Sequence, residues 1–170
     1  MKRYPTDTNS KHSSGCALLH TMATLCGYVC ILPRGFPDGS MPDVIHVNVE
    51  RRGLFIGDAK ASETPGNSET AVRLTRYVRW LAIHIQDRKA IGTFALAVSS
   101  PKDSAGWAAL LKGILHEAGL DGGSVRVKRV SKDQALVFSH LTGLATRTPR
   151  ASSGSAIHSL GLSNLHHNIR

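Results

Sequence analysis

Two acids and a lysine are the residues of this chain whose types and spacing could do chemistry together. Asp43 stands at the start of one apolar run, and Asp58 and Lys60 stand at the end of the next, after a turn at 51–53. The two runs predict an antiparallel β-hairpin, which folds the start of the first strand onto the end of the second. Because successive side chains of a strand point to opposite faces, Asp58 and Lys60 share a face, and all three side chains could converge.

Neighbouring carboxylates repel each other unless a cation lies between them, and their hard oxygen atoms suit Mg²⁺ or Mn²⁺. A lysine beside such a cation can hold a water molecule or a scissile phosphate. These residues therefore indicate hydrolysis of phosphodiesters. An ordinary hairpin with a surface aspartate and a surface lysine is the alternative interpretation.

Pro42-Asp43 followed by Asp58-Ala59-Lys60, with a strand, a turn and a strand between them, resembles the motif of the PD-(D/E)XK nuclease superfamily. That superfamily includes restriction endonucleases and Holliday-junction resolvases, and the resemblance covers roughly residues 14–140. It implies a restriction endonuclease-like core and metal-dependent endonucleolytic cleavage of DNA. It also implies that Asp43, Asp58 and the backbone carbonyl of Ala59 hold Mg²⁺, for which Mn²⁺ can substitute, while Lys60 positions or helps to deprotonate the attacking water.

The resemblance also suggests accessory residues around this site. Many members carry a glutamate on the helix before the hairpin, but residues 14–30 contain no acid. His20 is the polar candidate on that helix, and Glu63 is a candidate for the missing carboxylate, although a structural histidine and a loop acid near a helix start are the preferred interpretations. Arg73 and Tyr77 approximate the polar residue and the tyrosine that the following helix often directs toward the active site.

The chain is strongly basic, with 21 Lys and Arg against 12 Asp and Glu, a formal net charge of +9 and a pI near 10.0. Such an excess favours polyanions, so DNA is the expected partner. A non-catalytic nucleic-acid-binding or assembly protein on the same fold is the alternative function, and a basic domain that binds an acidic protein is a third. The positions expected to bind the DNA backbone are Arg73, Arg76, Arg126 and Lys128.

The expected order of elements is helix, two strands, helix, strand, helix, two strands. This alternation predicts an α/β fold in which helices flank a central mixed β-sheet. We expect a flexible N-terminus at 1–13, a nuclease-like domain at 14–141 and a basic, flexible tail at 142–170. The helices are expected over 14–30, 68–88 and 104–118, and the strands over 43–50, 54–60, 91–98, 125–130 and 135–138.

Cysteine is sparse: the chain has Cys16, Cys26 and Cys30. On a helix Cys26 and Cys30 would share a face, and His12 and His20 are nearby, so a zinc site is conceivable, but the spacing matches no common set of ligands. Buried thiols in a reducing compartment are the preferred interpretation.

Several broader expectations concern location and partners. No apolar run reaches the roughly 20 residues that a membrane span needs, and no hydrophobic segment follows the basic start of the chain. We therefore expect a cytoplasmic or nucleoid-associated protein that is not secreted and does not bind membranes. Since no sequence-reading module is visible, DNA structure or a targeting subunit is expected to select the substrate. A two-fold homodimer would supply paired sites for two cuts.

Overall fold

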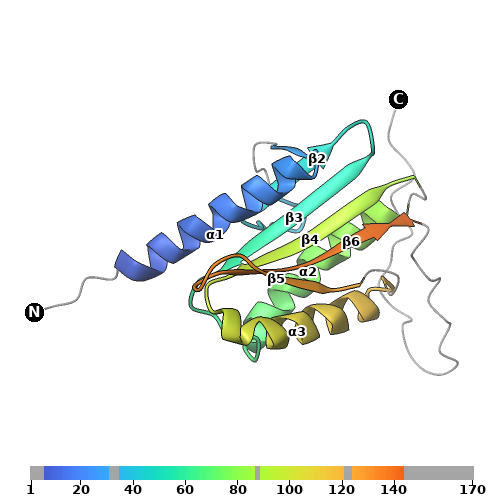
Figure 1. Cartoon of the computed structure of the whole chain (residues 1–170). Helices are drawn as coiled ribbons and strands as arrows, with labels where there is room; N and C mark the ends of the chain where they lie inside the picture. Colours follow the sequence, from blue (N-terminus) through green and yellow to red (C-terminus); the bar gives the residue numbers. More distant parts are fainter. Residues whose placement is uncertain (1–5, 31–34, 87–88, 121–123, 144–170) are drawn as a thin grey trace, which may run out of the picture.

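The computed structural model describes residues 6–30, 35–86, 89–120 and 124–143 (Figure 1). A mixed β-sheet forms its centre, with helices on both faces, which confirms the predicted α/β fold. The helices of this part of the chain are α1 (Thr6–Leu25), α2 (Ser68–Ile85) and α3 (Ser104–Glu117), the last preceded by a 3₁₀ turn at Pro101–Asp103. Its strands are β1 (Val29–Cys30), β2 (Val44–Asn48), β3 (Gly53–Lys60), β4 (Ile91–Val98), β5 (Arg126–Arg129) and β6 (Ala135–Thr142).

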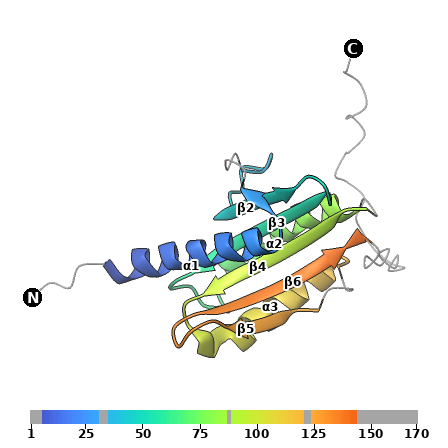
Figure 2. The ribbon, with the colours of Figure 1, turned by 45° about the horizontal axis from the view of Figure 1, so that its top comes forward.

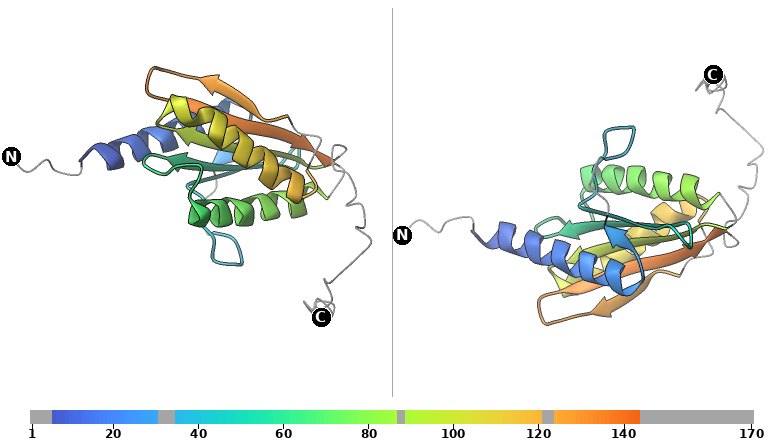
Figure 3. Two further views of the ribbon diagram at one scale, coloured as in Figure 1. Left: turned by 90° about the horizontal axis from the view of Figure 1, so that it is seen from below. Right: turned by 90° about the horizontal axis from the view of Figure 1, so that it is seen from above.

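The six strands of the described residues lie in the order β1-β2-β3-β4-β6-β5. Strands β2 and β3 form the predicted antiparallel hairpin, with Val44 opposite Gly57. Strand β4 then runs parallel to β3, because α2 carries the chain back along the sheet. Helix α1 covers one face, and α2 and α3 cover the other (Figures 2 and 3).

The turn of the hairpin differs from the expected glycine turn. Arg52, not Gly53, has the left-handed conformation, with φ of 48°. Gly53 is already the first residue of β3, and its lack of a side chain serves packing instead. A Cβ there would lie 2.8 Å from the Tyr28 ring and 3.0 Å from Cβ of Asn48, so the close approach of these neighbours requires glycine.

Helix α1 differs most from its prediction, at both of its ends. It begins at Thr6 instead of near Ser14, because its first turns bury no apolar side chain that periodicity could detect. It ends at Leu25, because Gly27 takes a φ of 82° and the amide of Tyr28 donates to the carbonyl of Ala23. Spacings of three and four residues predict Leu18, Met22, Leu25 and Val29 as the core face of this helix. Leu18 and Met22 do pack against the core, but Leu25 and Val29 are exposed, and the buried positions are Gly15, Leu19 and Ala23.

The early end of α1 also changes the environment of the cysteines. Cys30 lies in β1 and is exposed, so the predicted shared helical face with Cys26 is wrong. Cys16 and Cys26 are half-buried, and all three cysteines are thiols. The expected burial therefore fails most clearly for Cys30.

The other elements follow their predictions closely. Asn67 caps α2 by accepting hydrogen bonds from the amides of Glu69 and Thr70. Strand β6 continues to Thr142, four residues past its expected end and onto the first residue of the expected tail, and residues 144–170 of that tail lie outside the described residues. Within the described part, no helix combines the length and the apolar composition needed to cross a membrane.

Candidate active site at the open end of the hairpin

The hairpin brings Asp43, Asp58 and Lys60 together, as the sequence predicts. Asp43 comes just before β2, and the register of the hairpin sets it beside Asp58 near the end of β3. Oδ2 of Asp43 accepts a hydrogen bond of 2.7 Å from the backbone amide of Ala59. The first acid is thus fixed to the strand that carries the second acid and the lysine.

Acidic and basic side chains form a continuous series of ion pairs in the site. Nζ of Lys60 lies 2.5 Å from Oδ2 of Asp58 and 2.7 Å from Oε2 of Glu63. The other carboxylate oxygen of Glu63 pairs with the guanidinium group of Arg73. The Lys60 side chain is only 1% exposed, and its ammonium group lies 6.0 Å from the ring centroid of Trp107. Glu63, predicted as an accessory residue, and Arg73, predicted to bind the DNA backbone, therefore both contribute to this site.

Burial makes Asp58 the most perturbed acid of the pocket. Loss of hydration raises its pKa to about 6; Lys60 opposes this rise, and the neighbouring Asp43 adds to it. Glu63 behaves differently: burial alone would raise its pKa, but hydrogen bonds and charges from Lys60 and Arg73 lower it. Above about pH 6 Asp58 is therefore ionised, although its negative charge is less stable in this buried position than it would be in water.

Helix α1 contributes two residues that the sequence did not assign to this site. Nε2 of His12 lies 3.2 Å from Oδ1 of Asp43, and Sγ of Cys16 lies 3.8 Å from Nδ1 of His12. Burial, together with Asp43 and Asp58, raises the pKa of the Cys16 thiol to about 11. The spacing of four residues between His12 and Cys16 is the signal that could have found them, since such residues share a helical face.

Gly15 brings α1 close enough to the sheet for these contacts. A Cβ at this position would lie 2.9 Å from Cβ of Ala59 and 3.4 Å from Cβ of Ala97. The helix therefore rests directly on β3 and β4, and on β3 it does so at Ala59, the residue between Asp58 and Lys60. This close packing brings His12, one turn earlier on α1, within reach of Asp43.

A polar cavity of about 470 Å³ opens above these groups, between the start of α1, the loop at 61–63 and α2. On its far side the hydroxyl of Tyr77 donates a 3.1 Å hydrogen bond to the carbonyl of Met41. Burial and the negative charge of Asp58 raise the pKa of Tyr77, which therefore stays a hydrogen-bond donor. Tyr77 thus lines the site, as expected, and also holds the segment that leads into Asp43.

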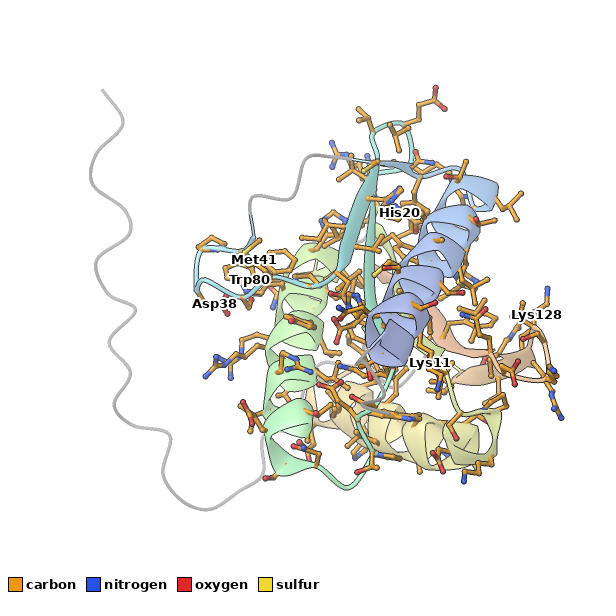
Figure 4. All side chains as sticks on the ribbon, turned by 90° about the vertical axis from the view of Figure 1, so that its left-hand side faces the viewer. Lys11, His20, Asp38, Met41, Trp80 and Lys128 are labelled. Carbon is orange, nitrogen blue, oxygen red and sulfur yellow. The ribbon has the colours of Figure 1, made fainter. Side chains whose placement is uncertain are left out.

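The loop before Asp43 is tied to α2 at a second point. Nε1 of Trp80 donates a 3.0 Å hydrogen bond to Oδ2 of Asp38, and Phe36 stacks on Trp80 with ring centroids 5.3 Å apart. Figure 4 shows Asp38, Met41 and Trp80 gathered beside α2. These contacts restrain the approach of the chain to β2 and so the position of the first acid.

Four other candidates do not line this cavity. His20 instead contacts His46, and Arg76 is exposed on α2. Arg126 and Lys128 lie on β5, the edge strand three places from β3. Figure 4 shows Lys128 on the opposite side of α1 from Trp80 of α2. At a strand spacing of about 4.8 Å, β5 is roughly 14 Å from β3.

The donor set fits a hard divalent cation. Asp43 and Asp58 offer carboxylate oxygens, and the carbonyl of Ala59 faces the same side as its amide, toward Asp43. The carboxylates of Asp43, Asp58 and Glu63 exceed the cations of Lys60 and Arg73 by one negative charge when His12 is neutral. A cation at this point would offset both that excess and the unfavourable ionisation of Asp58.

Comparisons of the chain with family models, with curated proteins and with solved structures gave no match. The chemistry of the pocket is therefore the basis for assigning a function. Its distinguishing property is that two adjacent carboxylates and a buried lysine meet in an open cavity of a basic protein.

Proposed function

We propose that this chain is a metal-dependent DNA endonuclease. The observation that carries the proposal is the convergence of Asp43, Asp58 and Lys60 at one end of the hairpin, with Asp58 ionised unfavourably by burial. The element order also supports it: a helix, an antiparallel hairpin and a crossover helix lead to a parallel strand. That order agrees with the core implied by the resemblance to PD-(D/E)XK nucleases.

The residues of the site suggest separate roles in metal binding and in positioning the attacking water. Mg²⁺, or Mn²⁺ in its place, would be held by Asp43, Asp58 and the Ala59 carbonyl and would screen charge on the phosphate oxygens. The Lys60 ammonium group has three N–H donors, and its ion pairs with Asp58 and Glu63 leave one for a water molecule. Lys60 therefore orients the attacking water and stabilises the negative charge that develops on it. In-line attack would leave a 5′-phosphate.

The basic residues suggest the path of the DNA. Arg73 is at the wall of the cavity, which supports a role for it in contacting phosphates next to the scissile one. Arg126 and Lys128 face the α1 side of the sheet, because they pair with Phe138 and Leu136 of β6. They can contact DNA only if it extends well beyond the scissile phosphate, which favours a duplex or branched substrate.

The test is cleavage of labelled linear, single-stranded and four-way-junction DNA in Mg²⁺, Mn²⁺ or EDTA. We expect Asp58→Asn to lower cleavage by about 10²–10³-fold or more while salt-sensitive DNA binding remains. Asp133→Asn, the same change at an exposed turn, is the matched control and should cleave like the wild type. Metal-dependent cleavage that persists in purified Asp58→Asn protein would refute the assignment.

A non-catalytic DNA-binding protein is the second candidate, and one observation favours it. Helix α1 presents His12 to the site where an acid would be expected, and Lys60 is already held by two carboxylates. Thermal unfolding with and without Mg²⁺ or Mn²⁺ separates the two functions. A nuclease site should gain stability from the metal in wild type but not in Asp58→Asn, whereas a binding protein should bind DNA without any such gain.

A further inference from the structure

A second group of metal-ligating side chains lies along α1, away from the acid pocket. His20 of α1, Cys30 of β1 and His46 of β2 each offer one ligand atom, and these atoms lie within 4.8 Å of one another. Nδ1 of His20 and Nε2 of His46 are 2.7 Å apart. Figure 4 shows His20 on the side of α1 that faces β2.

The fold brings these residues together from distant parts of the sequence. Cys30 lies directly opposite His46 in the register of β1 and β2. His20 follows the buried Leu19, which packs α1 onto the sheet, so its ring extends over the edge strands. His46 is 2% exposed and is one of the few polar side chains buried in the sheet, whereas His20 and Cys30 are open to solvent.

We propose that His20, Cys30 and His46 form a binding site for Zn²⁺, with water in the fourth position. Two imidazole nitrogens and a thiolate sulfur form a ligand set that Zn²⁺ favours. Bonds of about 2.0–2.3 Å in a tetrahedron require ligand atoms about 3.3–3.8 Å apart. The two nitrogens are closer than this, so the exposed ring of His20 has to turn outward by about 0.6 Å while His46 stays in the sheet.

The ligand chemistry distinguishes this site from the acid pocket. The cluster contains no carboxylate, so it offers nothing to Mg²⁺, whereas nitrogen and sulfur donors suit Zn²⁺ and related transition metals. His12 and His20 are about 12 Å apart along α1, and Asp43 and His46 are about 10 Å apart along β2. The two groups are therefore separate sites, and the zinc site does not depend on the proposed nuclease activity.

A metal ion here would join three elements at the edge of the sheet. Strand β1 has only two residues, and its pairing with β2 is short. Coordination would link this strand covalently to α1 and to the buried His46, and would deprotonate the Cys30 thiol on binding. The role we infer is structural: the ion fixes the end of α1 and the edge strand against β2.

The test uses the full chain, freed of metal by a chelator and then titrated with Co²⁺ in excess Mg²⁺, which keeps the acid pocket occupied. Co²⁺ serves as the spectroscopic substitute for Zn²⁺, because a thiolate ligand gives it a charge-transfer band in the near ultraviolet. We expect about one Co²⁺ per chain, displaced by Zn²⁺. Cys30→Ser should abolish the band, and His20→Ala should weaken Zn²⁺ binding at least about tenfold.

Both of these residues are exposed, so their variants should fold, which thermal unfolding would verify. The matched controls are Cys26→Ser and Cys16→Ser, together with a double change of the tail residues, His166→Asn and His167→Asn. Each control should keep the band. An absent band, or one that survives Cys30→Ser, would overturn the proposal. Loss of the band in Cys16→Ser would place the ion beside Asp43 instead, and loss in the tail variant would show an adventitious ion only.

Discussion

The acid pocket and the His20–Cys30–His46 cluster lie at two points along the same pair of elements, α1 and β2. Helix α1 supplies His12 to one and His20 to the other, while β2 contributes Asp43 at its start and His46 near its middle. What differs is the donor chemistry: oxygen atoms beside a buried lysine in the pocket, and nitrogen and sulfur atoms in the cluster. One scaffold can thus present two sites whose side chains alone decide which ion they favour.

The largest expected effect comes from Lys60→Met, which breaks the ion pair of the acid pocket. Asp58 would stay buried without its cation, so the free energy of unfolding should fall by about 3–5 kcal/mol at pH 7.5. The loss should shrink at pH 5, where Asp58, whose pKa is about 6, takes up a proton. Urea denaturation at both pH values measures this. A loss no greater than that of the exposed control Lys128→Met would contradict it.

The next largest effect should come from Gly15→Val, which tests whether both sites depend on the packing of α1 against the sheet. The added side chain would collide with Ala59 and push α1 from the sheet, at a cost of about 1–3 kcal/mol. Both Mg²⁺-dependent cleavage and the Co²⁺ band should then weaken, because α1 carries a residue of each site. Ala17→Val, on the exposed side of α1, is the control. Loss of only one function would show that the sites are supported separately.

A smaller effect of opposite sign is expected from Asp58→Asn without metal. Native Asp58 holds its proton more tightly than the unfolded chain does, so the native protein loses stability as the pH rises from about 4 to about 6. At pH 8 the variant should therefore be more stable than wild type by about 1–3 kcal/mol. For the same reason, the stability that wild type gains from Mg²⁺ should decline below about pH 6. Thermal unfolding across this pH range, with Asp133→Asn as control, checks both statements.

The smallest effect tests the independence of the sites. His20→Ala should leave Mg²⁺-dependent cleavage within about twofold of wild type, since His20 lies in the cluster and contacts His46. His12→Ala, the same change two turns earlier on α1, should reduce cleavage by about 10–100-fold, because His12 contacts and orients Asp43. Initial cleavage rates at saturating Mg²⁺ measure the pair. Equal losses in both variants would mean that the sites are coupled.

The sequence predicts the acid pocket far better than the cluster, and the reason is distance along the chain. Asp43, Asp58 and Lys60 belong to one hairpin, whose register follows from alternation and a short turn. His20 and His46 are separated by 26 positions, and Cys30 meets them only because Gly27 ends α1 and starts a new strand. The apolar spacing in residues 14–30 predicted a helix that included Val29, so the end of α1 at Leu25 was not predicted.

The fold shows the same division. Strand β4 and helix α2 are clear in the sequence because their apolar patterns are long, and the structure matches them within a few residues. The first turns of α1 bury no apolar side chain and left no pattern to read, so His12 could not be placed over Asp43. Tyr77 was expected to face the active site, but its hydrogen bond to the Met41 carbonyl and its exposure of only 2% could not be read from the sequence.

The two edges of the sheet affect how copies of this chain can associate. At one edge β5 is exposed along its whole length and carries Arg126, Lys128 and Arg129, while at the other edge β1 has only two residues. A short strand and a positively charged strand both discourage a second sheet from pairing with them. We therefore expect that any homodimer forms through helices or loops, and that crowded copies of the protein resist growth into continuous β-sheet fibres.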